Sequence, residues 1–225
     1  MILLLSALIS IGPKLPELPK GNPEDITKFV AKVDTVTAGA KSLVSGTLEN
    51  LVVTGQVLLG LESVGADQKA ALQSENDKAL GAIENLKGVD IGNPDSLAKV
   101  LKDGKSIASE YMGLITTSIT AEGAASAVSG QKEAIQQFLD QAVTDAASVV
   151  NKAGEAVALA PNAAKAKGMG AAKDLTMTTT AGNTLDEGAI GTVVDKGAGF
   201  AKDMSGLVGE TSDIVKAYQK VLSGL

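Results

Sequence analysis

Two Gly-x-Gly segments are the first candidates for chemistry in this chain, Gly168-Met169-Gly170 and Gly197-Ala198-Gly199. Glycine-rich turns can cradle phosphate groups, because their backbone N–H groups approach the ligand closely. Neither segment has the third glycine of a dinucleotide fingerprint or the Gly-Lys-Ser/Thr of a P-loop, and neither follows a convincing strand. We therefore predict that all four glycines are sites of close helix packing and bind no nucleotide.

Two acidic pairs, Glu24-Asp25 and Asp186-Glu187, could be considered as metal ligands or as acid/base groups. Oxygen-only metal sites need more converging ligands than either pair supplies. Both pairs stand where a helix is expected to begin, and negative charge in the first turn stabilises a helix through its macrodipole. We predict that they cap helices.

The residue types that are missing narrow the chemistry further. The 225 residues include no histidine, cysteine or tryptophan, and all 20 basic residues are lysines. The chain therefore lacks the usual general base near neutral pH, the thiol nucleophile and the bidentate phosphate clamp of arginine. Its serines have no histidine partner, and nothing in the local sequence marks a Ser–Lys dyad. We predict no catalytic, cofactor-binding or metal-ligating residues and no enzymatic activity.

Composition indicates a folded, acidic, helical protein. Hydrophobic residues make up 44% of the chain and aromatic residues only 2%, and the mean hydropathy is +0.17. Small aliphatic side chains suit helices packed at close range better than strands, which favour aromatic and β-branched residues. The net charge of −6 argues against nucleic acid as a partner, because phosphate binding requires a basic patch.

Apolar periodicity and helix caps predict the elements that position these residues. Asn22-Pro23 and Asn93-Pro94 are helix starts, each followed by an acidic residue. Residues 51–61 are apolar nearly all round, so we expect them to be central. Five segments keep helical spacing: 23 to about 65, 67–87, 94 to a bend near Gly123, 135–157 with Pro161 after it, and 192–222. We predict an all-α, elongated up-and-down bundle of about five long helices in one domain, 21–225, with residues 176–180 as a loop or short extended segment.

One internal repeat stands out. Residues 167–176, KGMGAAKDLT, match residues 196–205, KGAGFAKDMS. The interval between the two copies is close to eight helical turns, so they would share a face if one helix were continuous through both.

The first 20 residues form a separate segment. Residues 1–11, MILLLSALISI, are almost wholly apolar, and Pro13, Pro16 and Pro19 follow them in an extended tether. The apolar run is too short to span a bilayer as a helix and has the length of a secretory h-region, although no basic n-region precedes it. Residues 8–12, LISIG, resemble the lipobox of bacterial lipoproteins, with Ile11 standing where the lipidated cysteine would be. The resemblance implies export; alternatives are that Ile2–Ile11 packs on the bundle or on a neighbouring subunit.

From these observations we expect a non-enzymatic, extracytoplasmic protein of the cell envelope or surface, whose bundle binds a protein partner, an apolar ligand or itself. The alternative is a membrane-active protein that inserts a segment poor in charge and rich in small residues, either 111–129 or 175–194.

Overall fold

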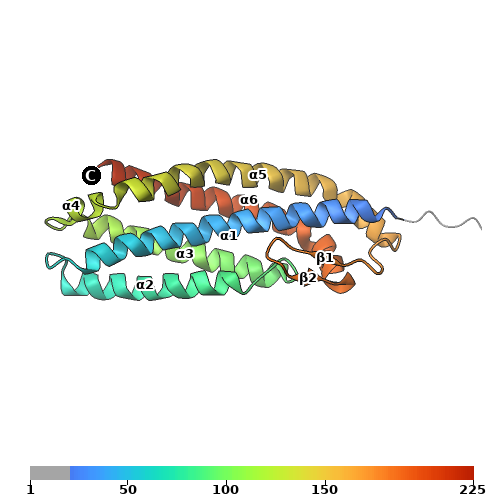
Figure 1. Cartoon of the computed structure of the whole chain (residues 1–225), viewed down its shortest axis with the longest axis horizontal. Coiled ribbons are helices and arrows are strands. Elements are labelled where there is room, and N and C mark those ends of the chain that lie inside the picture. Colours follow the sequence, from blue (N-terminus) through green and yellow to red (C-terminus); the bar gives the residue numbers. More distant parts are fainter. Residues whose placement is uncertain (1–20) are drawn as a thin grey trace, which may run out of the picture.

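A computed structural model describes residues 21–225. It is an elongated bundle of helices, which confirms the all-α class (Figure 1). The elements are α1 (Pro23–Leu59), α2 (Ala66–Lys87), α3 (Pro94–Ser118), α4 (Ala124–Ser129), α5 (Lys132–Gly168), β1 (Met177–Thr178), β2 (Thr184–Leu185) and α6 (Glu187–Ser223). Five of the helices are long, and the short α4 lies in the connection between α3 and α5. The predicted apolar segment and tether, 1–20, lie outside the described residues.

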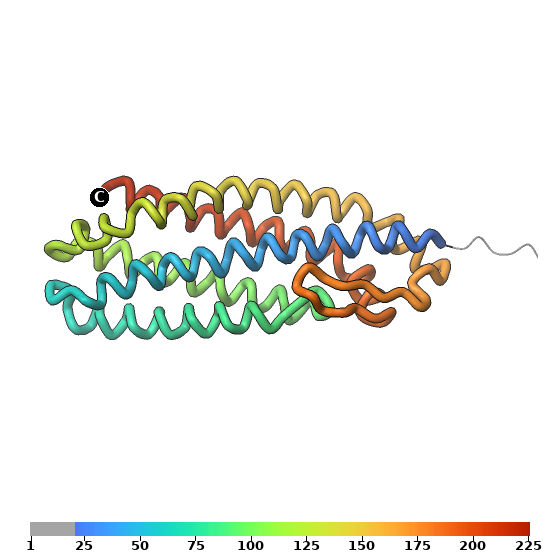
Figure 2. Tube along the Cα trace, in the orientation of Figure 1, coloured from blue at the N-terminus to red at the C-terminus, as the bar shows by residue number. Residues whose placement is uncertain are grey.

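Helix α1 is the central helix of the bundle (Figure 2). It packs against α2, α3, α5 and α6, whereas α2 packs mainly against α1 and α3. Its apolar side chains therefore have to face several directions, which explains why the expected stretch near Leu51 is apolar nearly all round. The α1 side chains that are completely buried include Ile26, Phe29, Val33, Val36, Ala40, Val44, Leu48, Leu51 and Leu58.

The predicted helix starts are present. The Asn22 side chain accepts a hydrogen bond from the Glu24 N–H at 3.1 Å, and Asn93 accepts one from the Ser96 N–H at 3.2 Å. Asp186 accepts from the Ala189 N–H at 2.8 Å. Each side chain satisfies an N–H group that has no partner within its own helix. The acidic pairs accordingly occupy helix starts, as predicted.

Several helix boundaries differ from the prediction, among them the start of α6, which is Glu187 and not residue 192. Helix α1 ends at Leu59 with Gly60 as its cap, and Gly65 is instead the residue that precedes α2. The expected bend near Gly123 is a full break, because α3 ends at Ser118 and Gly123 has a φ of 74°. Glycine adopts this left-handed conformation without the strain that a Cβ causes.

The prediction that Pro161 follows the helix was wrong, because α5 continues through it to Gly168. Proline removes one backbone hydrogen bond and normally breaks or kinks a helix. Pro161 is exposed, and the buried face of α5 continues beyond it through Ala163 and Ala166. Tertiary packing on both sides of Pro161 therefore outweighs the local penalty.

Between α5 and α6 the chain forms a small antiparallel hairpin, with Met177 paired to Leu185 and Thr178 to Thr184. This confirms the expected short extended segment. Asp34 of α1 anchors the hairpin, since its carboxylate accepts hydrogen bonds from the Thr180 N–H at 2.6 Å and from the Thr180 hydroxyl at 2.5 Å.

The two copies of the repeat do not lie in one helix, so the expected shared face is not formed. The first copy covers the last residues of α5 and the turn after it, where Gly170 and Asp174 have positive φ angles. The second copy lies inside α6. The hairpin separates them, although Lys167 of the first copy pairs with Asp195, next to the second, at 2.5 Å.

Candidate binding groove

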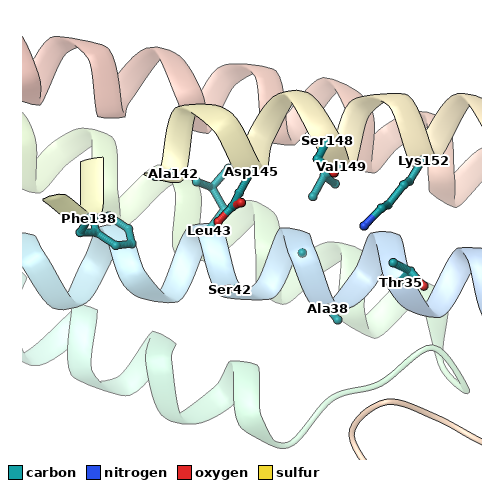
Figure 3. Close-up of a pocket in the computed structure, with 11 residues that line it drawn as sticks. Thr35, Ala38, Ser42, Leu43, Phe138, Ala142, Asp145, Ser148, Val149 and Lys152 are labelled. Atoms are coloured by element: carbon teal, nitrogen blue, oxygen red, sulfur yellow. The ribbon is translucent and has the colours of Figure 1, made fainter. Parts of the chain in front are cut away.

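A groove between α1 and α5 combines apolar and charged lining residues, and its volume is about 280 Å³. The two helices are antiparallel, since Lys32 of α1 pairs with Glu155 of α5 while Gly46 lies against Phe138. Residues at helical spacing on each helix face the groove (Figure 3): Thr35, Ala38, Gly39, Ser42 and Leu43 of α1, and Phe138, Ala142, Asp145, Ser148, Val149 and Lys152 of α5.

Small residues bring the two helices close beneath the groove. A Cβ added at Gly39 would meet the side chain of Val149, and one added at Gly46 would lie 2.8 Å from Cζ of Phe138. Only glycine leaves room for these two side chains on the facing helix. Val149 and Leu43 are buried, so the floor of the groove is apolar.

The rim of the groove is polar and carries both signs of charge. Figure 3 shows the side chains of Asp145 and Lys152 directed from α5 toward α1. Asp145 accepts a hydrogen bond from the Gln141 amide at 2.8 Å. Among residues 21–225, neither Asp145 nor Lys152 belongs to an ion pair, whereas Lys32, Lys105 and Lys167 each pair with a carboxylate on another helix. The separation of Asp145 and Lys152 along the chain corresponds to about 10 Å of helix.

A second hollow of about 610 Å³ continues the groove toward the start of α1 and shares Thr35 with it. Its polar wall is the ion pair between Lys32 and Glu155, 2.6 Å apart. The hydrogen bond from Lys32, and then its positive charge, lower the pKa of Glu155, so this carboxylate stays ionised. Ala31 and Leu159 add apolar surface.

A buried polar layer crosses the bundle near the middle of α2 and contains both tyrosines of the chain. Tyr111 donates to Oδ1 of Asn76 at 3.3 Å, and Tyr218 donates to the carbonyl of Asn50 at 3.2 Å and also contacts the Thr54 hydroxyl. Burial raises the pKa of Tyr218 to about 12 and raises that of Tyr111 as well. Both phenols are therefore neutral hydrogen-bonding groups that link helices, and nothing marks them as acids or bases for catalysis.

Glu75 lies at the edge of this layer and is 6% exposed. Its Oε1 is 2.5 Å from the Lys78 ammonium, which is one turn further along α2. Its Oε2 is buried and has no hydrogen-bond partner among the described residues. The adjacent lysine supplies the compensating charge that a buried carboxylate requires.

The four glycines of the repeat have different surroundings in the structure. A Cβ at Gly197 would lie 2.7 Å from Cζ of Phe29, so this glycine is a close-packing site, as predicted. A Cβ at Gly168, Gly170 or Gly199 would meet nothing within 4 Å, so the prediction was wrong for these three. Gly168 is the last residue of α5, Gly170 lies in the turn after it, and Gly199 faces outward from α6.

The groove was missed at the sequence level because α1 and α5 are about a hundred residues apart in the chain. Small residues at helical spacing, such as Ala38, Gly39 and Ser42, were a signal that α1 approaches another helix, but they did not identify which one. Within the described residues, no cluster of three or more histidine, cysteine or carboxylate side chains could hold a metal ion.

The segments considered for membrane insertion have other structures. Residues 111–129 include the end of α3, a turn and α4, and Tyr111 and Ile115 are buried in the core. Residues 175–194 form the hairpin and the first turns of α6. In the described part of the chain, no helix combines the length and apolar character that crossing a membrane would take.

Comparisons with protein-family models, with curated proteins and with solved structures give no match to this chain.

Proposed function

We propose that this protein is a non-enzymatic, extracytoplasmic binding protein of the cell envelope or surface, and that the groove between α1 and α5 is its binding site. The ligand that fits best is a small amphipathic molecule or side chain with an apolar body and a charged end. The observation that carries the proposal is the position of Asp145 and Lys152 at the rim of an apolar floor.

The shape of the groove supports a ligand of this kind. Binding pockets combine an apolar lining with a few placed polar groups. The groove has both, and its volume of about 280 Å³ suits a small ligand. The apolar body would lie on Leu43, Ala142 and Val149. An anionic end would reach Lys152 and a cationic end Asp145. The chain has no histidine, cysteine or arginine, which supports a role in binding without catalysis.

The probe for the groove is anilinonaphthalene sulfonate, which combines an apolar ring system with one negative charge and becomes fluorescent in apolar surroundings. We expect it to bind the native protein at one site. Lys152→Gln should weaken this binding about tenfold, because one charge-assisted contact is worth about 1.5–3 kcal/mol. Ser42→Trp, a substitution on α1, should also weaken binding of the probe, because the larger side chain would fill the groove.

Lys102→Gln is the matched control, since Lys102 is an exposed lysine of α3 outside the groove. Equal losses from Lys152→Gln and Lys102→Gln would mean that the probe responds to net charge, and the groove would no longer be supported as the binding site. Dye release from anionic vesicles tests the alternative, membrane-active function directly, because a binding protein should leave the vesicles intact.

The proposed extracytoplasmic localisation rests on the sequence of residues 1–20 and needs its own experiment. Fractionation of the native source, followed by intact-mass analysis, should place the protein in the envelope, the periplasm or the medium. A cytoplasmic protein of full mass would contradict the proposed localisation, and the test of binding in the groove would still be valid.

A further inference from the structure

Helix α5 presents a second, separate surface on the side away from the groove. Six exposed positions follow one another there at alternating intervals of three and four residues: Ala147, Val150, Gly154, Val157, Pro161 and Ala164. Val150 is 37% exposed and Val157 is 41% exposed. Alternation of three and four is the heptad spacing by which one helix meets another, and this stripe has no partner within residues 21–225. We call it the outer stripe of α5.

Helix α2 provides an internal comparison, because it is also an outer helix that packs on two long neighbours. Its exposed positions at the same spacing carry polar and charged side chains with a single apolar exception, Leu80; they are Gln73, Asp77, Leu80, Glu84 and Lys87. A lone exposed leucine is ordinary on a protein surface. The outer stripe of α5, in contrast, has no charged residue over about five turns.

Charged residues at the two ends of the outer stripe indicate which partner binds it. Asp140 stands one heptad before Ala147, and Lys165 stands directly after Ala164; both side chains are exposed. Asp140 accepts hydrogen bonds from Gln136 and Gln219 through Oδ1 alone. The acid and the base are about 37 Å apart along the helix.

This arrangement is complementary to itself when it is turned end to end. In an antiparallel pair of α5 helices with the two-fold axis near residue 152, Val150 lies beside Gly154 of the second copy and Ala147 lies beside Val157. The same register places Asp140 beside Lys165 of the second copy, twice per pair. A parallel pair would instead set Asp140 against Asp140 and Lys165 against Lys165, and like charges at those distances repel.

We propose that the outer stripe of α5 is an interface between two copies of this chain, paired antiparallel about residue 152. Small side chains at Ala147, Gly154 and Ala164 let the helix backbones approach closely, while Val150 and Val157 supply apolar area. A single helix pair buries less than a standard interface of about 800 Å² per partner, so the dimer is weak and forms at micromolar concentrations. The interface is on the far side of α5 from the groove and does not depend on the proposed function.

The first experiment measures the mass of the full chain by sedimentation equilibrium over a wide range of concentrations. We expect a monomer–dimer equilibrium that Val150→Glu shifts at least about tenfold toward monomer, since a buried, unpaired charge is costly. Leu80→Glu is the matched control, because it changes an exposed apolar residue on the other outer helix and should leave the equilibrium unchanged. Lys165→Glu should weaken the dimer, and the charge-swapped pair Asp140→Lys with Lys165→Glu should restore it.

The second experiment tests the register, and the absence of native cysteine makes any cross-link unambiguous. A mixture of Ala147→Cys protein and Val157→Cys protein should form the mixed disulfide dimer under mild oxidation. Ala147→Cys protein alone should cross-link poorly, because its two sulfurs would be about 15 Å apart along the axis.

Three outcomes would overturn the proposal. The first is a protein that stays monomeric at every concentration while its helical content is intact. A protein that stays monomeric and uses Val150 to bind lipid vesicles would overturn the proposal in the same way. Another is efficient cross-linking of Ala147→Cys protein with itself, which indicates a parallel pair. The last is a dimer that neither Val150→Glu nor the charge reversals affect, which would place the interface elsewhere.

Discussion

The phenolic oxygen of Tyr111 would overlap with the Cβ of any residue other than glycine at position 55, and Cζ of the same ring lies 2.6 Å from the position of that Cβ. The only buried glycine of α1 therefore faces one of the two tyrosines of the chain. Gly55 thus determines where the Tyr111 ring can sit, and with it the hydrogen bond to Asn76 that links α3 to α2.

Gly55→Ala should lower the free energy of unfolding by about 1–3 kcal/mol, because the new methyl group overpacks the core. Tyr111→Leu removes the end of the ring that this methyl group meets, so the cost of Gly55→Ala should nearly disappear in the Tyr111→Leu background. Urea unfolding of the four proteins gives this coupling. Gly81→Ala is the control, since position 81 of α2 is exposed and open; it should stabilise the helix by about 0.5–1 kcal/mol. Equal costs of Gly55→Ala in both backgrounds would disprove the contact.

The two glycines of the second repeat copy should respond in opposite directions. A Cβ at Gly197 would stand 2.7 Å from Cζ of Phe29. Gly197→Ala should therefore destabilise the protein by about 1–3 kcal/mol through overpacking. Position 199 of the same helix faces open space, and Gly199→Ala should stabilise the protein by up to about 1 kcal/mol through helix propensity. Thermal and urea unfolding measure both effects. Saturating ATP should not change either melting temperature, and a rise would revive the phosphate-binding interpretation.

Pro161→Ala should raise the free energy of unfolding by about 1–3 kcal/mol, because alanine restores the N–H group that can donate to the Val157 carbonyl and relieves the clash of the proline ring with the preceding turn. Pro23→Ala is the control, because Pro23 is the first residue of α1, where the N–H has no partner within the helix. Urea unfolding compares the two variants. A loss of stability at position 161 would show that the bend caused by proline is needed for α5 to follow its neighbours.

Ionisation of the two tyrosines should lower the stability of the folded protein at high pH. The pKa of Tyr218 is raised by burial from 10.0 to about 12, and burial raises that of Tyr111 too. The unfolded chain therefore loses these protons first. The contribution of the two tyrosines should be constant below about pH 10, and stability should fall as the pH rises toward about 12, by about 1.4 kcal/mol for each pH unit that separates the folded and unfolded pKa values.

Phenolate absorbance follows both groups directly, because the chain has no tryptophan. We expect the absorbance to rise together with the loss of helical circular dichroism, and Tyr218→Phe should reduce its amplitude by half. Early, non-cooperative ionisation would contradict the burial of the phenols.

Deletion of residues 1–20 should leave helical content and melting temperature nearly unchanged. Helix α1 begins after Asn22, which caps it by accepting a hydrogen bond from the Glu24 N–H. Circular dichroism of the shortened and full-length proteins tests this. A large loss of stability would mean that the apolar residues Ile2–Ile11 belong to the folded core.

Local features were predictable from the sequence, and features that depend on distant neighbours were not. Asn22, Asn93 and Asp186 were recognisable as caps because a cap bonds to a backbone N–H two or three residues away. The continuation of α5 through Pro161 was not, because it depends on packing against other helices. Gly197 and Gly199 have nearly the same local sequence, and only the position of Phe29 in another helix distinguishes them.

The central position of α1 has a consequence for how the chain reaches its native state. Helix α1 is synthesised before α2 to α6, yet α5 and α6, with which it packs closely, begin about 110 and about 160 residues after the start of α1. Until then, α2 and α3 can cover part of its apolar surface, but the sides that face α5 and α6 stay uncovered. Contacts between residues so far apart in sequence form late and slowly. The part of the core that α1 shares with α5 and α6 therefore cannot form until α6 has been synthesised.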